Sequence, residues 1–171
     1  MPQLSAETAE IDLVEMIRVG MSEMKIVTSP SVLITTVGSC VALCMYDSKL
    51  HIGGMAHIVL PTNESLKDND SPFKFADTAV PALASALISR GASRRFIKAK
   101  IAGGANMFPM FDYNVLNIGK NNVAMVKNAL FKENIPLVAE DVGGTYGRKV
   151  EFSVASGKLR ISTISGEVKV L

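Results

Sequence analysis

The chain contains only two cysteines and two histidines, and all four lie in one stretch, as Cys40, Cys44, His51 and His57. A cysteine becomes a nucleophile when a nearby base takes its proton, and histidine usually supplies both that base and the acid that protonates the leaving group. The same residue types also bind zinc, and cysteines can form disulfides or lie in the core as inert thiols. This stretch could therefore hold a cysteine nucleophile, a zinc site, a disulfide or an inert core thiol.

A nucleophile at Cys40 would have the local chain features that it needs. Gly38 allows the backbone to turn tightly before Cys40. The amides around Cys40 would then face a reacting carbonyl group as an oxyanion hole. His57 follows on the next apolar segment, and neighbouring antiparallel strands would bring it within reach of the thiol. Taken alone, however, one cysteine and one histidine fit a buried inert thiol better than a nucleophile.

Zinc and a disulfide fit the spacing less well. Structural zinc sites usually place a close cysteine pair on a turn and follow it with a second pair at similar spacing, whereas Cys40 and Cys44 flank a strand-like apolar run. We expect Cys44 to lie in the core and His51, in a polar turn, to be exposed. A structural disulfide is unexpected in a reducing compartment.

Composition narrows the class of protein. The 171 residues are 48% hydrophobic and 20% charged, with a formal net charge of +2, which is typical of one compact globular domain. The charge is too small to indicate a nucleic-acid surface. The apolar runs are too short for a membrane span, and the N-terminal segment does not resemble a secretory signal, so we expect a cytoplasmic protein.

The apolar pattern predicts many short strands. Short apolar stretches alternate with turn residues over 13–34, and strands are predicted at 41–46, 53–60, 96–102, 137–142, 148–154 and 158–164, with a last short strand at 168–171. Ser156-Gly157 indicates a hairpin turn. Residues 1–12 are predicted to be a flexible tail, followed by a single domain over 13–171.

Two helices are predicted between these strands. The first has apolar residues at helical spacing over 80–88, an N-cap at Asp77 or Thr78, and a stop at Gly91. The second runs from about 120 to 133 and ends before Pro136. This order predicts an α+β fold, with mostly antiparallel or mixed sheets in layers and the two helices packed on a face.

Three further features have plain interpretations. Gly103-Gly104 and Gly143-Gly144 fit no dinucleotide or phosphate-loop pattern, so we expect turns or close backbone approach there. The Met and Phe residues between 107 and 111 are expected to be core residues rather than a partner surface. Asp141 and Arg148 are predicted to pair, either near a site or at the surface.

Several motifs occur in an order typical of one family. They are VGSCVALCMYD, GGMAHIVLP, KFADTAV, KIAGGANMF, NIGKNN and AEDVGGTYGRKVEF. Together they resemble the chemoreceptor glutamine deamidases of bacterial chemotaxis, the CheD family, over roughly residues 17–164. The resemblance implies a Cys-His site similar to those of papain and of glutamine-deamidating toxins. Cys40 would be the nucleophile and His57 the base and acid, with Gly38 and Ser39 shaping the oxyanion hole.

The resemblance also implies a threonine in the site. The family has one six residues before its cysteine, but Ile34 occupies that position here. A one-residue shortening would put Thr35 in the family's position, whereas strand parity with Cys40 favours Thr36. We expect Thr35 to be the third member. A backbone carbonyl group could also orient His57.

The implied function is deamidation of specific glutamines in methyl-accepting chemotaxis receptors through a cysteine thioester, without cofactor or metal. Each event would add one negative charge to a receptor helix. An alternative is a weakly catalytic or non-catalytic module that regulates a CheC-type phosphatase of the response regulator. A Cys-His peptidase is a third interpretation, and it predicts cleaved substrate.

Overall fold

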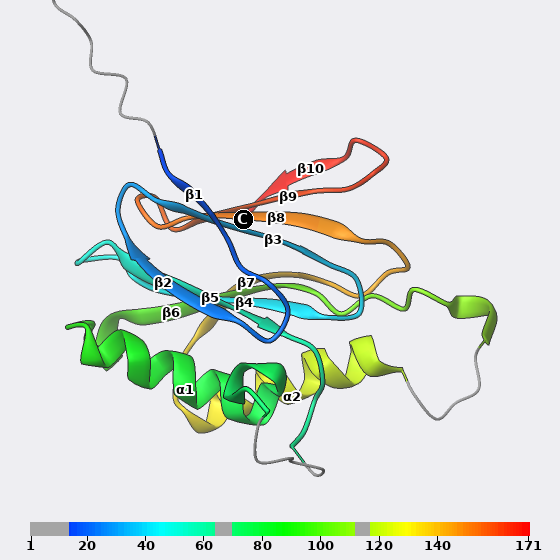
Figure 1. The fold of residues 1–171 in the computed structure, drawn as a ribbon, viewed down its shortest axis with the longest axis horizontal. Helices are drawn as coiled ribbons and strands as arrows, with labels where there is room; N and C mark the ends of the chain where they lie inside the picture. Colours follow the sequence, from blue (N-terminus) through cyan, green and yellow to red (C-terminus); the bar gives the residue numbers. More distant parts are fainter. Residues whose placement is uncertain (1–13, 64–69, 112–116) are drawn as a thin grey trace, which may run out of the picture.

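The fold has three layers, which are two β-sheets and a pair of helices (Figure 1). A computed structural model describes residues 14–63, 70–111 and 117–171. The helices cover one face of the second sheet, and the other face of that sheet packs against the first sheet. The predicted α+β class with layered sheets is confirmed, whereas the tail predicted for residues 1–12 lies outside the described residues.

The first sheet has the strand order β1-β3-β8-β9-β10. Its strands are β1 (Met16–Arg18), β3 (Val32–Val37), β8 (Arg148–Ser153), β9 (Lys158–Ser162) and β10 (Val168–Val170). β1 and β3 pair in parallel, and the other neighbours pair antiparallel. The predicted hairpin joins β8 to β9, and Gly157 in its turn has the positive φ of 68° that glycine adopts readily.

The second sheet has the strand order β2-β5-β4-β6-β7. Its strands are β2 (Met24–Thr28), β5 (Ile52–Ile58), β4 (Val41–Asp47), β6 (Ile97–Gly103) and β7 (Leu137–Val142). Only β6 and β7 pair in parallel, so both sheets are mixed. β3 and β4 belong to different sheets, and the chain therefore passes from the first sheet to the second at residues 38–40.

β4 lies in the middle of the second sheet and is buried along its whole length. Leu43 and Met45 pack on the helix side, while Ala42, Cys44 and Tyr46 pack between the two sheets. Because side chains alternate between the faces of a strand, a continuous apolar run is needed where both faces are covered. This explains why the residues around the cysteines are so uniformly apolar.

The first helix, α1 (Ala76–Ser89), begins earlier than predicted. Its N-cap is Phe75 rather than Asp77 or Thr78, and no side chain caps it. Tertiary contacts set the start instead, because the backbone N–H of Ala76 donates to the Leu60 carbonyl at 2.9 Å and Phe75 is buried. Gly91, with a φ of 100°, follows the end of the helix as predicted.

The second helix, α2 (Ile118–Lys132), also begins two residues before the predicted start. Asn117 caps it, since its side-chain oxygen accepts from the backbone N–H of Lys120 at 3.0 Å. Three short 3₁₀ segments complete the described elements, at Pro72–Lys74, Arg94–Phe96 and Pro109–Phe111. None of the helices in the described ranges is long and apolar enough to cross a membrane.

Candidate active site

Cys40 lies in the turn that carries the chain from the first sheet to the second. This turn packs against the backbone that follows β6, where the N–H of Gly104 donates to the Cys40 carbonyl at 2.8 Å and the N–H of Ala105 donates to the Gly38 carbonyl at 2.9 Å. A Cβ on Gly103 would collide with the Cys40 carbonyl oxygen. Close backbone approach, as predicted, explains this glycine.

His57 lies on β5, next to the strand that Cys40 precedes. The β4–β5 register pairs Ala42 with His57, so their side chains point to the same face of the sheet, toward the layer between the sheets. Cys40 comes two residues before Ala42 and packs against the same layer. The Cys40 turn and His57 thus lie at the same end of the β4–β5 pair, with Cys40 directly before the first residue of β4.

Thr35 and the Val19 carbonyl lie beside the imidazole. The Thr35 Oγ1 is 2.8 Å from His57 Nδ1 and 2.8 Å from the Val19 carbonyl oxygen. A hydroxyl has one proton and the carbonyl can only accept, so Thr35 donates to Val19 and accepts from Nδ1–H. The neutral imidazole therefore has its lone pair on Nε2. Since Thr35 is on β3, this bond joins the two sheets.

Thr36, the alternative to Thr35, points away from His57. Residues alternate along β3, with Thr35 buried and Thr36 exposed. The parity argument for Thr36 treated Cys40 as part of the same strand, but β3 ends at Val37 and the turn breaks the alternation. The structure thus places Thr35, and not Thr36, beside the imidazole.

Burial favours the neutral forms of the Cys40 thiol and the His57 imidazole. Burial raises the pKa of the Cys40 thiol, although its own backbone N–H partly opposes the shift. Burial also lowers the pKa of His57, opposed in part by the Val19 carbonyl. At neutral pH the site therefore holds a thiol and a neutral imidazole rather than an ion pair.

The raised pKa of Cys40 predicts the pH dependence of its alkylation. We expect the rate with iodoacetamide to keep rising from about pH 7 to about pH 9, because the reactive thiolate still increases over this range. The measurement is the alkylated fraction against time at each pH, by mass spectrometry of the Cys40 peptide. A plateau near neutral pH would mean that the thiol is already ionised and would contradict the prediction.

Removing the Thr35 hydroxyl should slow a reaction that uses His57. In Thr35→Val the Nδ1–H loses its acceptor, and a hydrogen bond to an imidazolium contributes about 1.5–3 kcal/mol, so kcat should fall about 10- to 100-fold. Thr35→Ser keeps the hydroxyl and serves as the control, with kcat close to wild type. Equal rates for Thr35→Val and wild type would show that the hydroxyl does not assist His57.

Asn122 on α2 contacts the same region, and sequence reasoning did not identify it. Its side-chain nitrogen donates to the Ser39 carbonyl at 3.0 Å and to the Val59 carbonyl at 2.9 Å. Ser39 thus takes part in the turn through its backbone. The available signal was a polar residue four positions before Val126, on the buried face of the helix.

The four residues considered as zinc ligands do not come together as one group. Cys44 is fully buried between the sheets, and His51 is exposed at the opposite end of β5 from His57, as expected for each. His51 Nδ1 is 3.1 Å from the Ala155 carbonyl oxygen. Within the described ranges, no three Cys, His, Asp or Glu side chains are grouped as metal ligands would be.

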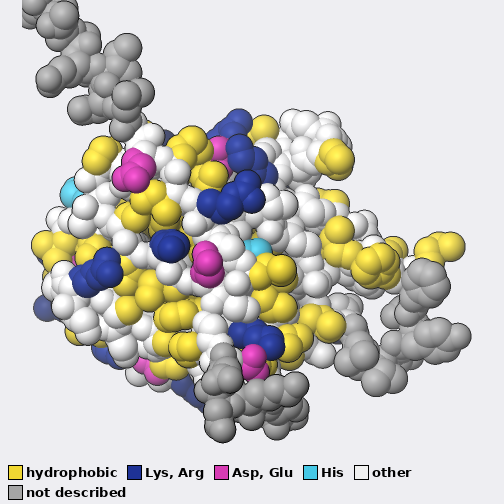
Figure 2. Space-filling view, viewed as in Figure 1, with side chains coloured by type: hydrophobic (Ala, Val, Ile, Leu, Met, Phe, Trp, Pro, Cys, Tyr) yellow, Lys and Arg dark blue, Asp and Glu magenta, His cyan; other side chains and the backbone are white. Residues whose placement is uncertain are grey.

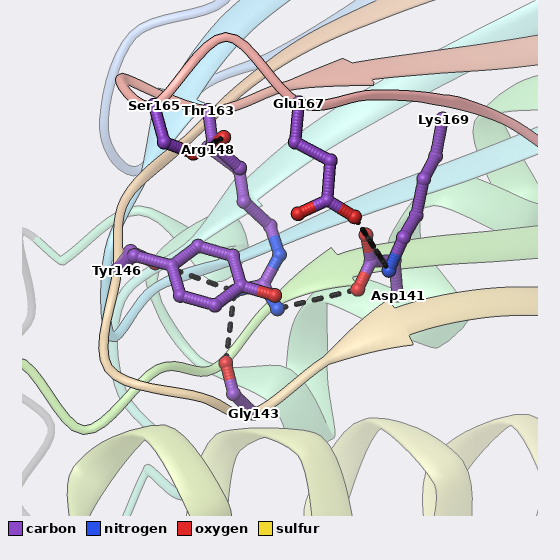
Figure 3. A network of polar contacts seen from close by, with 8 residues as sticks. All are labelled: Asp141, Gly143, Tyr146, Arg148, Thr163, Ser165, Glu167 and Lys169. Atoms are coloured by element: carbon purple, nitrogen blue, oxygen red, sulfur yellow. Dashed lines mark hydrogen bonds and ion pairs between the residues drawn. The ribbon is translucent and has the colours of Figure 1, made fainter.

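The buried Arg148 pairs with the partly buried Asp141 (Figure 3). The Arg148 side chain is 1% exposed, and Nη2 is 3.3 Å from Asp141 Oδ1. Nη1 donates to the Gly143 carbonyl at 2.9 Å, and the guanidinium lies 4.5 Å from the centre of the Tyr146 ring. This arginine therefore fixes the turn between β7 and β8.

That turn supports the backbone behind Cys40. The N–H of Gly143 donates to the Gly103 carbonyl at 3.0 Å, and the N–H of Asn106 donates to the Gly144 carbonyl at 2.8 Å. The segment 103–106 is thus held between the Cys40 turn on one side and the turn fixed by Arg148 on the other. Arg148 is thus connected to the Cys40 turn through the backbone contacts of Gly143 and of the segment 103–106.

The prediction that the Met and Phe residues after β6 are core residues is wrong for those whose side chains are described. Met107, Phe108 and Met110 are 40%, 72% and 92% exposed. The chain leaves the sheet at Gly103, and hydrophobic side chains project from the molecule on the side where this segment emerges (Figures 1 and 2). Met107 also contacts Gly38, where an added Cβ would be 3.1 Å from its side chain.

Comparison with known proteins agrees with the motif order. A sequence model described as "CheD chemotactic sensory transduction" matches residues 59–163, more than half of the chain. A protein of Moorella thermoacetica is 47% identical over 158 residues, covering 91% of this chain and 95% of its own length. A protein of Caldanaerobacter subterraneus is 40% identical over 159 residues, covering 92% and 98%.

A third relative, from Oceanobacillus iheyensis, is 41% identical over 155 residues and covers 89% of this chain and 93% of its own. All three are named "Probable chemoreceptor glutamine deamidase CheD". Such identity over nearly the whole length of both partners, together with the matching sequence model, places this chain in the CheD family.

Proposed function

We propose that this chain is a protein-glutamine deamidase that converts glutamines of methyl-accepting chemotaxis receptors to glutamate. The names of its relatives support the substrate. The observation that carries the chemistry is the imidazole of His57, held by Thr35 at 2.8 Å through Nδ1, on the strand next to Cys40. As in papain, a third group orients the histidine that would act as the base for the cysteine.

In the first half of the reaction, His57 Nε2 takes the Cys40 proton while Sγ attacks the side-chain carbonyl carbon of the glutamine. A C–S bond forms, and the carbonyl π electrons move to oxygen. Backbone N–H groups of the Cys40 turn stabilise this oxyanion. The Thr35 oxygen keeps its bond to Nδ1–H as the ring becomes positively charged, which strengthens that bond.

In the second step the protonated His57 donates its Nε2 proton to the amide nitrogen, the C–N bond breaks, and ammonia leaves. The γ-glutamyl thioester remains on Cys40. Neutral His57 then activates a water molecule, which attacks the thioester carbon and releases glutamate, and the thiol recovers its proton. These steps use only side chains, backbone and water.

The neutral thiol of Cys40 and the neutral imidazole of His57 fit this order of reaction steps. With a raised pKa on the thiol and a lowered pKa on the imidazole, the proton stays on sulfur in the resting site. Proton transfer and attack are then coupled, and negative charge develops only where the oxyanion hole can stabilise it. An enzyme that acts on a few glutamines of one partner gains protection of its thiol from unselective alkylation.

The test is mass spectrometry of a chemoreceptor cytoplasmic fragment incubated with the protein. We expect specific glutamine peptides to gain the mass of an amide-to-acid conversion, with release of ammonia. The protein alkylated at Cys40 with iodoacetamide is the control and should give no conversion. Cleaved fragments would indicate a peptidase, and an unchanged receptor from the same organism would contradict the proposal.

A second candidate function is regulation of a CheC-type phosphatase. The exposed Met107, Phe108 and Met110 favour it, since apolar side chains beside a site suit contact with another protein. This activity would not need the thiol, so it should persist after Cys40 alkylation. The position of Thr35 beside His57 supports catalysis as the main function.

A further inference from the structure

Asn122 is a polar side chain in a place that otherwise selects apolar ones. It is fully buried on the face of α2 that also carries Val126 and Leu130. A buried amide is unfavourable unless its hydrogen bonds are specific and well made. The helix start is also packed very closely here, because a Cβ on Gly119 would collide with the carbonyl oxygens of Gly104 and Ala105.

Both protons of the Asn122 amide go to backbone carbonyl groups. The acceptors are Ser39, just before Cys40, and Val59, two residues after His57. Carbonyl oxygens can only accept, so the orientation of the amide is fixed by its partners. In the described parts of the chain its own oxygen, Oδ1, is buried with no donor within reach. The side chain thus satisfies the two carbonyl groups at the expense of its own acceptor.

The two carbonyl groups lie just outside the paired part of the strands. The last paired residues of the β4–β5 ladder at this end are Val41 and Ile58. Beyond them no ladder bond joins the Cys40 turn to the continuation of the His57 strand. The Asn122 amide spans this gap and makes the contact that a further ladder step would have made.

We propose that Asn122 is a positioning residue, which holds the Cys40 turn against the end of β5 and so sets the thiol relative to the imidazole. The proposal rests on the proposed function for its kinetic readout. Its geometric part concerns only the relation of Cys40 to His57. A displacement of about 1 Å between reacting groups can slow a reaction about 100-fold.

The test compares Asn122→Asp and Asn122→Ala with Asn121→Asp. Asn121 is the exposed neighbour on the same helix, so its variant adds the same charge one residue nearer the helix start. Rates are taken per molecule with an alkylatable Cys40. We expect both Asn122 variants to lower kcat, on the order of 100-fold for Asn122→Asp, with KM within about twofold, and Asn121→Asp to match wild type.

A merely structural role would lower the unfolding temperature and the alkylatable fraction but leave kcat per active molecule unchanged, and that result would overturn the proposal. Failure of both Asn122 variants to fold would also overturn it, because the residue would then belong to the core rather than to the site. If only Asn122→Asp fails to fold, Asn122→Ala decides.

A second measurement does not depend on deamidation. His57→Gln should slow iodoacetamide alkylation of Cys40 several-fold in the wild-type background. In the Asn122→Ala background the slowing should be less than about twofold, because the Cys40 thiol is no longer held close to the His57 imidazole. The same slowing in both backgrounds would overturn the proposal, as would no slowing in either. Coupled alkylation in a protein that deamidates no receptor would support the positioning role while refuting the proposed function.

Discussion

Cys40→Ala is expected to fold normally and to convert no measurable receptor glutamine. In the proposed mechanism the substitution removes the sulfur that would form the thioester, and removal of a covalent nucleophile typically lowers kcat by more than about 10⁴-fold. Cys40 lies in a turn and is only half-buried, so the fold should tolerate the change. Mass spectrometry of the receptor fragment measures conversion, and circular dichroism measures folding.

Cys44→Ala is the matched control. Cys44 is fully buried between the sheets, and burial raises its pKa far above the ordinary thiol value, so it should not react. We expect its loss to lower the free energy of unfolding by about 1 kcal/mol, from the small cavity left in the core, and to leave deamidation nearly unchanged. Activity that survives in Cys40→Ala and disappears in Cys44→Ala would reverse the assignment of the nucleophile.

His57→Gln is expected to lower kcat about 10³-fold. Glutamine can still hydrogen-bond to Thr35, but its amide cannot take the Cys40 proton or return it to the leaving ammonia. General acid–base catalysis contributes about 10²- to 10⁴-fold, and the residual rate should come from thiolate already present in solution. This remaining activity should rise with pH, because burial raises the pKa of Cys40.

The pH dependence of kcat distinguishes the loss of the base from misfolding of the His57→Gln protein. In the wild type the acid limb should lie below about pH 6.5, since burial lowers the pKa of His57 and protonation removes the base as the pH falls. The His57→Gln protein should lack this limb. An acid limb that is unchanged in the variant would assign the base to another group.

Most strands and both helices could be predicted from the sequence, because the spacing of the apolar residues is regular. The continuous apolar run of β4 required burial on both faces, and the alternation around Ser156-Gly157 required a hairpin. Helix starts were less predictable, because α1 begins at a tertiary backbone contact of Ala76 and not at a side-chain cap. The exposed segment after Gly103 was mistaken for core, since composition does not say where a chain leaves its sheet.

The candidate site was predictable only in part for a similar reason. Cys40 and His57 were candidates from their residue types, but the family resemblance, and not their spacing, favoured them over an inert core thiol. Whether Thr35 or Thr36 faces the imidazole depended on where β3 ends and on which sheet it joins. Asn122 could be noticed only as a polar residue on the apolar face of its helix, and its partners could not be predicted, because they are backbone carbonyl groups from two distant segments.

The hydroxyl of Thr35 comes from one sheet and the imidazole of His57 from the other. A chain that has formed only the second sheet would carry the thiol and the histidine, but its imidazole would lack the partner that selects the tautomer. If the proposed site is correct, its full assembly requires the docking of the two sheets, because neither sheet alone holds both Thr35 and His57. A chain in which only the second sheet has formed would therefore be at most a weakly active deamidase on the proposed mechanism.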